Sequence, residues 1–243
     1  PIVNMASPLS TVTALSLFPI TMMPPLLNNA PTSLPGAYNT RAGYIGAFPC
    51  TPALSNAFTF ECWANIDANL TRTTCIFDTL PPGTSRGDTP GRLIGFVDTT
   101  NVVMAYVGNA GPLMRNLSSV ITPGVWNHIA WVWNGATSVM TCYLNGVAGA
   151  PVSIAGGLNV ITNGITIGVN CDTLSQFAQS TLYQPLMRNR VVYTSNFTPS
   201  QDPTPAALDT SVVYFLGPSL VEQVSGSVVQ TAGNVVNTYR GLA

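Results

Sequence analysis

Charged side chains are scarce in this 243-residue chain, where they make up 7% of the residues and leave a formal net charge of −1. Lysine is absent, so all eight basic residues are arginine. A nucleic-acid partner needs several cationic contacts to phosphate, and this composition argues against one. A soluble monomer normally carries more surface charge, so we expect much of the surface to be covered, most simply in a homo-oligomer.

Long apolar runs are also missing, and no stretch approaches the roughly 20 residues that span a membrane. The first thirty residues lack the basic n-region and continuous apolar core of a signal peptide. Pro1 suggests that an initiator methionine was removed, so we expect no secretory signal and synthesis in a cytoplasm. A mature protein numbered after cleavage is the alternative.

Cysteine pairs with metal-site or redox spacing are absent. The five cysteines lack CxxC spacing, and two of them, Cys62 and Cys142, fall on the expected inward faces of strands. We interpret all five as free thiols in a reducing compartment. They are Cys50, Cys62, Cys75, Cys142 and Cys171.

Paired carboxylates are absent as well. Glycoside hydrolysis uses two of them, one as acid and one as nucleophile or base. The chain has two glutamates, Glu61 and Glu222, and neither has a carboxylate two to four residues away. The single histidine, His128, follows a Trp-x-His pattern, which indicates a hydrogen-bonded core residue. We therefore predict no catalytic residues and no enzyme activity.

Short strand patterns separated by proline and glycine dominate the chain from residue 37 onward. This spacing, with little helical periodicity, indicates a β-sandwich or jelly roll. Asn134-Gly135 is a strong hairpin signal within residues 125–146, because both residue types tolerate positive φ. The expected strands are 57–66, 73–79, 92–98, 102–107, 125–134, 138–145, 164–170, 180–188 and 211–216.

Three separated motifs carry a family resemblance. They are Phe58-Thr-Phe-Glu-Cys-Trp-Ala64, the hairpin from Trp126 to Gly146, and Leu182–Arg188 followed by Phe197-Thr-Pro-Ser200. In this order they resemble the concanavalin A-like jelly rolls, in particular the laminin-G-like and pentraxin-like branch. The resemblance implies an all-β, two-sheet antiparallel sandwich over residues 37–243. It says little about function, since this fold serves lectins, adhesins, hydrolases and structural proteins.

The aromatic residues of two strands suggest a contact surface. If Trp126, His128, Ala130 and Val132 point inward, then Ile129, Trp131 and Trp133 point outward. Inward Phe58, Phe60, Cys62 and Ala64 likewise leave Trp63 outside. The exposed tryptophans then either stack on sugar rings or are covered by protein. Cover by protein also accounts for the low charge, and we favour it. The predicted contact residues are Trp63, Trp131 and Trp133.

We expect no cofactor and no structural zinc, because one histidine and scattered cysteines exclude the usual zinc spacings. Calcium stays possible, since the resemblance implies calcium sites at the sandwich rim of many relatives. The candidate ligands come from separate loops: Asp78, Asp88, Asp98 and Asp172. Arg86-Gly87-Asp88 resembles an integrin-recognition sequence, although Gly-Asp also simply makes turns.

Residues 1–36 differ from the rest, with seven prolines and no charged side chain. Proline disfavours a helix, so we predict an extended arm that lies on another surface. Packing on its own sandwich is the alternative. Its large apolar side chains are Leu15, Leu17, Phe18, Ile20, Met22, Met23, Leu26 and Leu27.

Together these features predict a non-enzymatic structural protein of a virus particle, most plausibly a phage. It would be a capsid decoration, cement or minor coat protein in the virion, assembling with other capsid proteins through its apolar surfaces and arm. The alternative is a carbohydrate-binding, lectin-like module that recognises host glycans, either a receptor-binding appendage or an extracellular adhesin.

Overall fold

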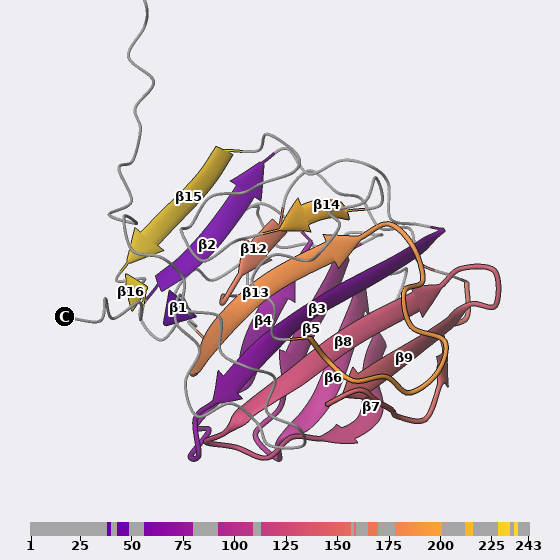
Figure 1. Ribbon diagram of the computed structural model, residues 1–243, viewed down its shortest axis with the longest axis horizontal. Helices are drawn as coiled ribbons and strands as arrows, with labels where there is room; N and C mark the ends of the chain where they lie inside the picture. Colours follow the sequence, from indigo (N-terminus) through magenta and orange to yellow (C-terminus); the bar gives the residue numbers. More distant parts are fainter. Residues whose placement is uncertain are drawn as a thin grey trace, which may run out of the picture.

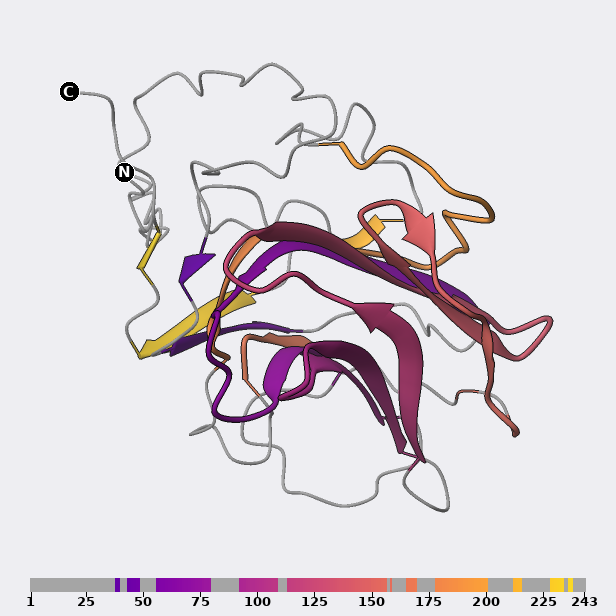
Figure 2. The same ribbon diagram turned by 90° about the horizontal axis from the view of Figure 1, so that it is seen from below.

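Two antiparallel β-sheets pack face to face as two layers (Figure 2). The computed structural model describes residues 38–39, 43–48, 56–79, 92–108, 113–156, 158, 165–169, 178–200, 212–215, 228–233 and 236–237. Within these ranges there is no helix, and so none that could cross a membrane. The predicted all-β sandwich is confirmed.

One sheet has nine strands (Figure 1). They are β1 (Tyr38–Asn39), β3 (Ala57–Ile66), β8 (Trp126–Asn134), β9 (Val139–Leu144), β10 (Val147–Ala148), β11 (Val152–Ser153), β13 (Ser180–Arg188), β14 (Val212–Phe215) and β16 (Val236–Asn237). Their order is β10-β9-β8-β3-β13-β1-β16, with β11 also pairing with β9 and β14 with β13. The long strands β3 and β8 therefore lie near its middle.

The other sheet has seven strands. They are β2 (Gly43–Phe48), β4 (Thr74–Asp78), β5 (Arg92–Val97), β6 (Val102–Gly108), β7 (Leu113–Val120), β12 (Ile165–Ile167) and β15 (Val228–Gly233). Their order is β15-β2-β12-β4-β5-β6-β7, which leaves β7 at one edge.

The nine strands predicted from the sequence all form. They correspond to β3, β4, β5, β6, β8, β9, β12, β13 and β14. The strand β7 was not predicted, because Arg115, Asn116 and the two serines at 118 and 119 interrupt its apolar pattern. The other strands that were not predicted are β2 and β15, which contain glycine, and β1, β10, β11 and β16, which are two residues long.

Aromatic rings from both sheets fill the space between the layers. Phe60 of β3 stacks on Phe77 of β4 with centroids 4.0 Å apart, and Trp131 of β8 meets Phe77 edge-on at 5.3 Å. A Cβ on Gly95 of β5 would lie 2.1 Å from the Phe77 ring. Glycine at position 95 thus leaves room for the central ring of the core.

The faces of β8 are the reverse of those predicted. Ile129, Trp131 and Trp133 belong to the main core, together with Phe60 and Cys62 of β3. The direct cross-strand pairing of Phe60 with Trp131 places these two side chains on the same, inward face. Trp126, His128, Ala130 and Val132 therefore occupy the outer face of the nine-stranded sheet, the side away from the other sheet.

The predicted Asn134-Gly135 turn is also corrected. The loop between β8 and β9 has four residues, Gly135–Ser138, and the positive φ falls on Ser138. Asn134 stabilises the loop by accepting a hydrogen bond from Ala136 N through its side chain. The two-residue turn with positive φ at both positions is Asn145-Gly146, between β9 and β10.

Several predicted features lie outside the described residues. These are the arm of residues 1–36, Arg86-Gly87-Asp88, Cys50, Cys171, Asp172 and Glu222. The remaining cysteines, Cys62, Cys75 and Cys142, are buried, and Cys62 and Cys142 are free thiols, as predicted.

Candidate functional site

A segment without regular secondary structure crosses the outer face of the nine-stranded sheet. It comprises residues 189–200, follows β13, and is called the strap below. In Figure 1 it is the orange trace that returns over β8 and β9. Val191, Tyr193 and Phe197 of the strap pack against Ala130, Val132 and Tyr143 of the sheet. This apolar cluster is separate from the main core.

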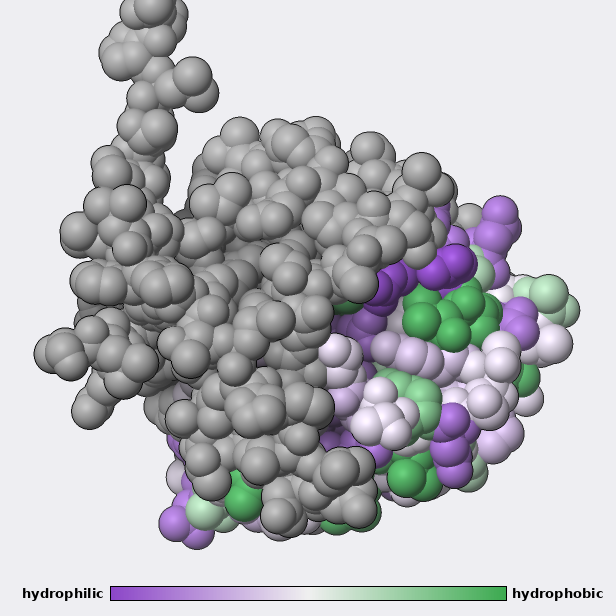
Figure 3. Space-filling view, in the orientation of Figure 1, coloured by the Kyte–Doolittle hydropathy of each residue, from purple (hydrophilic) through white to green (hydrophobic). Residues whose placement is uncertain are grey.

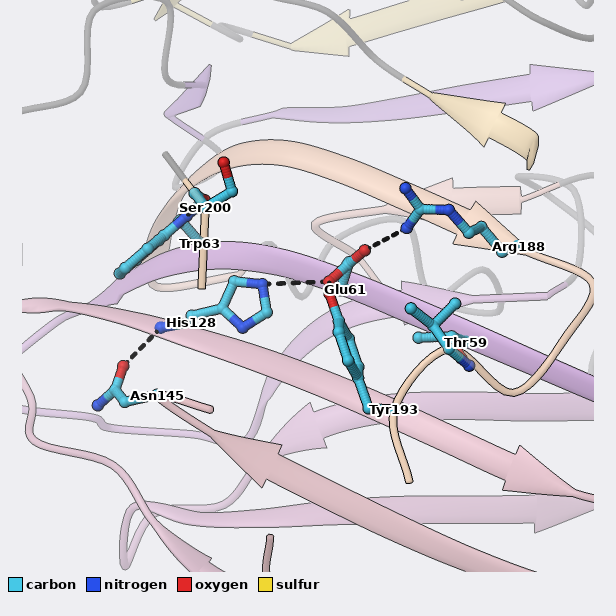
Figure 4. A network of polar contacts seen from close by, with 9 residues as sticks. Thr59, Glu61, Trp63, His128, Asn145, Arg188, Tyr193 and Ser200 are labelled. Carbon is cyan, nitrogen blue, oxygen red and sulfur yellow. Dashed lines mark hydrogen bonds and ion pairs between the residues drawn. The ribbon is translucent and has the colours of Figure 1, made fainter. Parts of the chain in front are cut away.

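Beneath the strap lies a polar network centred on Glu61 of β3 (Figure 4). Arg188 Nη1 lies 2.5 Å from Glu61 Oε1. The other oxygen, Oε2, accepts a hydrogen bond from the Tyr193 hydroxyl and lies 3.3 Å from His128 Nε2. Both carboxylate oxygens are therefore engaged by groups from β8, β13 and the strap.

Electrostatics keep this carboxylate ionised. Burial by itself would raise the pKa of Glu61, but hydrogen bonds from His128 and Tyr193 and the charge of Arg188 lower it below its usual value. The pKa of the Tyr193 hydroxyl is raised, first by burial and then by the neighbouring carboxylate. Tyr193 thus acts as a donor and Glu61 as an acceptor.

The arrangement suits a structural tie better than proton transfer. Glu61 is 6% exposed, and its two oxygens already have partners, so no position is left for a substrate atom or an attacking water. A carboxylate with a lowered pKa is also a poor general acid at neutral pH. What the network can do is hold β3, β8, β13 and the strap together.

His128 is buried and paired with Glu61, as expected for a hydrogen-bonded residue, but it lies beneath the strap rather than between the sheets. Its ring meets Trp63 and Phe197 edge-on, with centroids 5.3 and 5.7 Å apart. Its Nδ1 is buried and has no partner within the described structure.

The Asn145-Gly146 turn anchors the far end of the strap. Phe197 N donates to Gly146 O (2.9 Å), and Ala148 N donates to the side-chain oxygen of Asn196 (3.0 Å). A Cβ on Gly146 would lie 1.9 Å from Phe197 O, so the strap approaches to a distance that only glycine allows. This pairing explains why a glycine is needed at that turn.

Hydrogen bonds from β3 fix the rest of the strap. The Thr59 hydroxyl donates to Arg190 O (2.9 Å) and accepts from Val192 N (3.1 Å). Trp63 Nε1 donates to Ser200 O (2.9 Å). The outward residues of β3 therefore bind the strap one after another.

The predicted surface tryptophans have a different role. Trp131 and Trp133 are 0% and 1% exposed in the core, so the prediction that they form an outward contact surface is wrong. Trp63 does lie on the outer face, but it is 6% exposed and packs with Trp126 and Tyr183. In the described region that Figure 3 shows, hydrophobic residues form small groups among polar ones.

A second polar region is open to solvent. Loops 67–73 and 98–101 meet at one rim, because Thr74 of β4 pairs with Val97 of β5. The side-chain oxygen of Gln179 accepts from Thr71 N and Thr71 Oγ1, which fixes the first loop. Asp98 fixes the second by accepting from the backbone amides of Thr100 and Val102. We call these two loops the polar rim.

The exposed side chains of the polar rim carry hydroxyl, amide and guanidinium groups. They are Asn69, Thr71, Arg72, Thr73, Thr99 and Thr100. The bonds to Gln179 and Asp98 fix the loop backbones and also hold the hydroxyls of Thr71 and Thr100. A polar, weakly charged ligand could exchange hydrogen bonds with the exposed side chains.

The two described calcium candidates are otherwise engaged. Asp78 forms a buried ion pair with Arg92, and Asp98 caps its own turn. The pKa of Asp98 is lowered because hydrogen bonds from Val102 and Thr100 outweigh its partial burial. In the described ranges no three His, Cys, Asp or Glu side chains form a group that could hold a metal ion. These residues do not fit a calcium site.

Sequence reasoning missed Thr59, Arg188 and Tyr193, and also Asn145, whose side-chain oxygen accepts a hydrogen bond from His128 N (2.8 Å). Thr59, Asn145 and Arg188 stood in the motifs that carried the family resemblance, but nothing in those motifs indicated what they contact. Tyr193 lies 132 positions from Glu61, a separation at which sequence patterns carry no contact information.

The sequence matches a laminin G-type family model, which is described as the concanavalin A-like lectin/glucanases superfamily. The match covers residues 39–199, well over half of the chain. The chain belongs to this superfamily. Among curated protein sequences, none matches it significantly.

Solved structures agree on the fold. A native heptameric SAP-like pentraxin from Limulus polyphemus matches at 16% identity and a TM-score of 0.53, covering 86% of this chain and 96% of the pentraxin. A putative carbohydrate binding protein from Bacteroides ovatus matches at 13% identity and a TM-score of 0.55, covering 83% of this chain and 59% of that protein. Domains LG4-5 of the mouse laminin alpha1 chain match at 9% identity and a TM-score of 0.50, covering 72% of this chain and 48% of the laminin chain.

Proposed function

We propose that this chain is a non-enzymatic, carbohydrate-binding module of the lectin-like type. The observation that carries the proposal is superfamily membership over residues 39–199, supported by the structural likeness to a putative carbohydrate binding protein. This reading was the alternative from sequence alone, and the comparisons support it better than a virion role.

The ligand surface in this proposal is the polar rim. Sugars present many hydroxyl groups, which can exchange hydrogen bonds with exposed donors and acceptors such as the side chains of Asn69, Thr73 and Thr99. Rigid loops reduce the entropy lost on binding. The face beneath the strap is the weaker candidate, because the strap covers it and both oxygens of Glu61 already have partners there.

A glycan array of the full chain tests the proposal. We expect selective binding of a small group of glycans, weakened about tenfold or more by Asn69→Ala or Thr73→Ala, since centrally placed contacts dominate binding energies. Ser195→Ala on the exposed side of the strap is the matched control. An array without any selective ligand would contradict carbohydrate binding.

A second candidate, the structural component of a virus particle, is favoured by one feature. From Asn116 to Cys171 the sequence contains no Asp, Glu, Lys or Arg. Such a stretch suits burial between subunits. The expected partners are copies of this chain and capsid proteins. Deletion of residues 1–36 should then abolish assembly and leave a folded sandwich; unchanged assembly would contradict this role.

A further inference from the structure

The loop between β7 and β8, residues 121–125, is bonded to both loops of the polar rim. Gly124 N donates to Ile66 O (2.7 Å), directly before the first rim loop. Ile121 N donates to Asn101 O (2.9 Å), at the end of the second rim loop. We call residues 121–125 the third loop. These two backbone bonds place it beside the polar rim.

The third loop also touches the first rim loop directly. A Cβ on Gly124 would lie 3.8 Å from the Cβ of Ala68, which is an ordinary van der Waals distance. The pairing of Asn65 with Trp126 explains this contact, because it brings the end of β3 to the start of β8, at the lower left of Figure 1. Gly124 and Ala68 are both exposed. The two loops therefore form one continuous surface.

A buried amide holds the shape of the third loop. Asn127 is 1% exposed, and its side-chain nitrogen donates to Thr122 O (2.8 Å) and Val125 O (3.0 Å). Its side-chain oxygen accepts a hydrogen bond from the Asn145 side chain (3.4 Å). One side chain thus fixes the backbone of the third loop near both of its ends. A loop fixed in this way loses little conformational entropy when a ligand binds.

The third loop adds an apolar side chain to a polar surface. Val125 is 42% exposed and Pro123 is half-buried, whereas the first two loops expose no large apolar side chain. A sugar ring carries hydroxyl groups around its edge and apolar C–H groups on its faces. A ring face can therefore pack on Val125 while the hydroxyl groups exchange hydrogen bonds with Asn69 and Thr73.

The charges of the three loops disfavour an acidic ligand. Asp67 and Asp98 contribute two carboxylates and Arg72 contributes one guanidinium, so the formal net charge is −1. The third loop has no charged side chain. A sulfate or carboxylate group on a sugar would lie near the two aspartates, and like charges at a binding surface weaken association. A neutral sugar avoids this repulsion.

We propose that the third loop is part of the ligand surface, and that the ligand is a glycan ending in a neutral sugar ring, which packs one apolar face on Val125 and bonds to the polar rim through its hydroxyl groups. This inference rests on the proposed carbohydrate binding and narrows it. Val125 becomes a residue that selects the ligand, and sulfated and sialylated glycans are not the preferred class.

A glycan array followed by calorimetric titration of the best-bound glycan tests the inference. Val125→Ala removes two methyl groups from the contact, so we expect the dissociation constant to rise about fivefold or more. Val139→Ala is the matched control, because Val139 is also partly exposed but pairs with Asn134 at the opposite end of β8. It should bind like the wild type. Neutral glycans should bind at least about tenfold more tightly than their sulfated or sialylated forms.

The results separate this inference from the carbohydrate binding on which it rests. A selective glycan that is weakened by Asn69→Ala but bound equally by Val125→Ala and Val139→Ala overturns the inference and leaves the proposed function standing. A preference for sulfated or sialylated glycans does the same. An array without any selective ligand overturns both. Because Val125 is exposed, its truncation should leave the fold intact, and circular dichroism melting checks this.

Discussion

The network beneath the strap and the polar rim use similar side chains in opposite ways. Around Glu61, polar groups turn toward one another and are covered by the strap. At the rim, Gln179 and Asp98 hold the loop backbones and the hydroxyls of Thr71 and Thr100, and they leave the side chains of Asn69, Thr73 and Thr99 exposed. The first arrangement uses its hydrogen bonds to stabilise the fold. The second keeps hydrogen-bonding capacity available to a ligand.

The sharpest test of this difference removes the central carboxylate. Glu61→Ala leaves Arg188, whose side chain is 11% exposed, without its counter-charge and removes the acceptor of Tyr193, so we expect the free energy of unfolding to fall by about 3–5 kcal/mol. Thr73→Ala at the rim should change it by less than about 0.5 kcal/mol. Urea denaturation of both variants gives the two values. Equal values would erase the distinction between the regions.

Acid should reproduce part of that loss. The pKa of Glu61 is lower in the folded chain than its ordinary value of 4.5. The contribution of the Glu61 carboxylate to the free energy of unfolding is therefore fully present above pH 4.5. As the pH falls through the lowered pKa, the carboxylate is protonated and the contribution is lost. The Glu61→Gln variant should lack this component of acid destabilisation. If the wild type and Glu61→Gln showed the same pH dependence of unfolding, the ionised Glu61 carboxylate would not be stabilising the fold.

Two glycines test how closely the strap approaches the sheet. Gly146 and Gly156 both have positive φ, at 80° and 82°, but only a Cβ on Gly146 meets another residue. Gly156→Ala should cost about 1–2 kcal/mol from backbone strain alone. Gly146→Ala should cost about 2–4 kcal/mol, because it also collides with Phe197 O. Thermal unfolding compares the pair, and equal costs would show that the strap is not held there.

Removal of one hydroxyl from the network should destabilise the chain less than removal of the Glu61 carboxylate. Tyr193→Phe keeps the ring stacked on Phe197 but deletes the donor to Glu61. We expect a loss of about 1–2 kcal/mol in unfolding free energy, measured in urea. The glycan-binding profile should be unchanged. A lost glycan signal in a folded Tyr193→Phe chain would move the ligand surface to the strap.

The sequence predicted the fold well because turn residues and alternating strands are local signals. It failed on the faces of β8, where residues 126–133 are all buried and no polar face marks the outside. Both sides of this strand are covered, one by the core and the other by the strap. The pairing of Trp63 with His128 and of Phe60 with Trp131 decides the faces, and such registers are not visible in one sequence.

The candidate sites were less predictable for a related reason. Glu61 and His128 drew attention as single residues, but they pair with each other across two strands, and the further partners of Glu61, Arg188 and Tyr193, come from β13 and the strap. The strap itself has no periodicity, so nothing local marks it as a cover. The polar rim consists of ordinary loop residues, and only the strand pairing of Thr74 with Val97 brings its two loops together.

Native-state hydrogen exchange tests the central claim, that the strap closes the outer face and leaves recognition to the rim. The amides of Val192 and Phe197 donate to Thr59 and Gly146 beneath the strap. We predict that they exchange at least about 100-fold more slowly than those of Ala68 and Asn69 at the rim, after correction for intrinsic rates. Exchange of Val192 and Phe197 as fast as the rim amides would contradict the account.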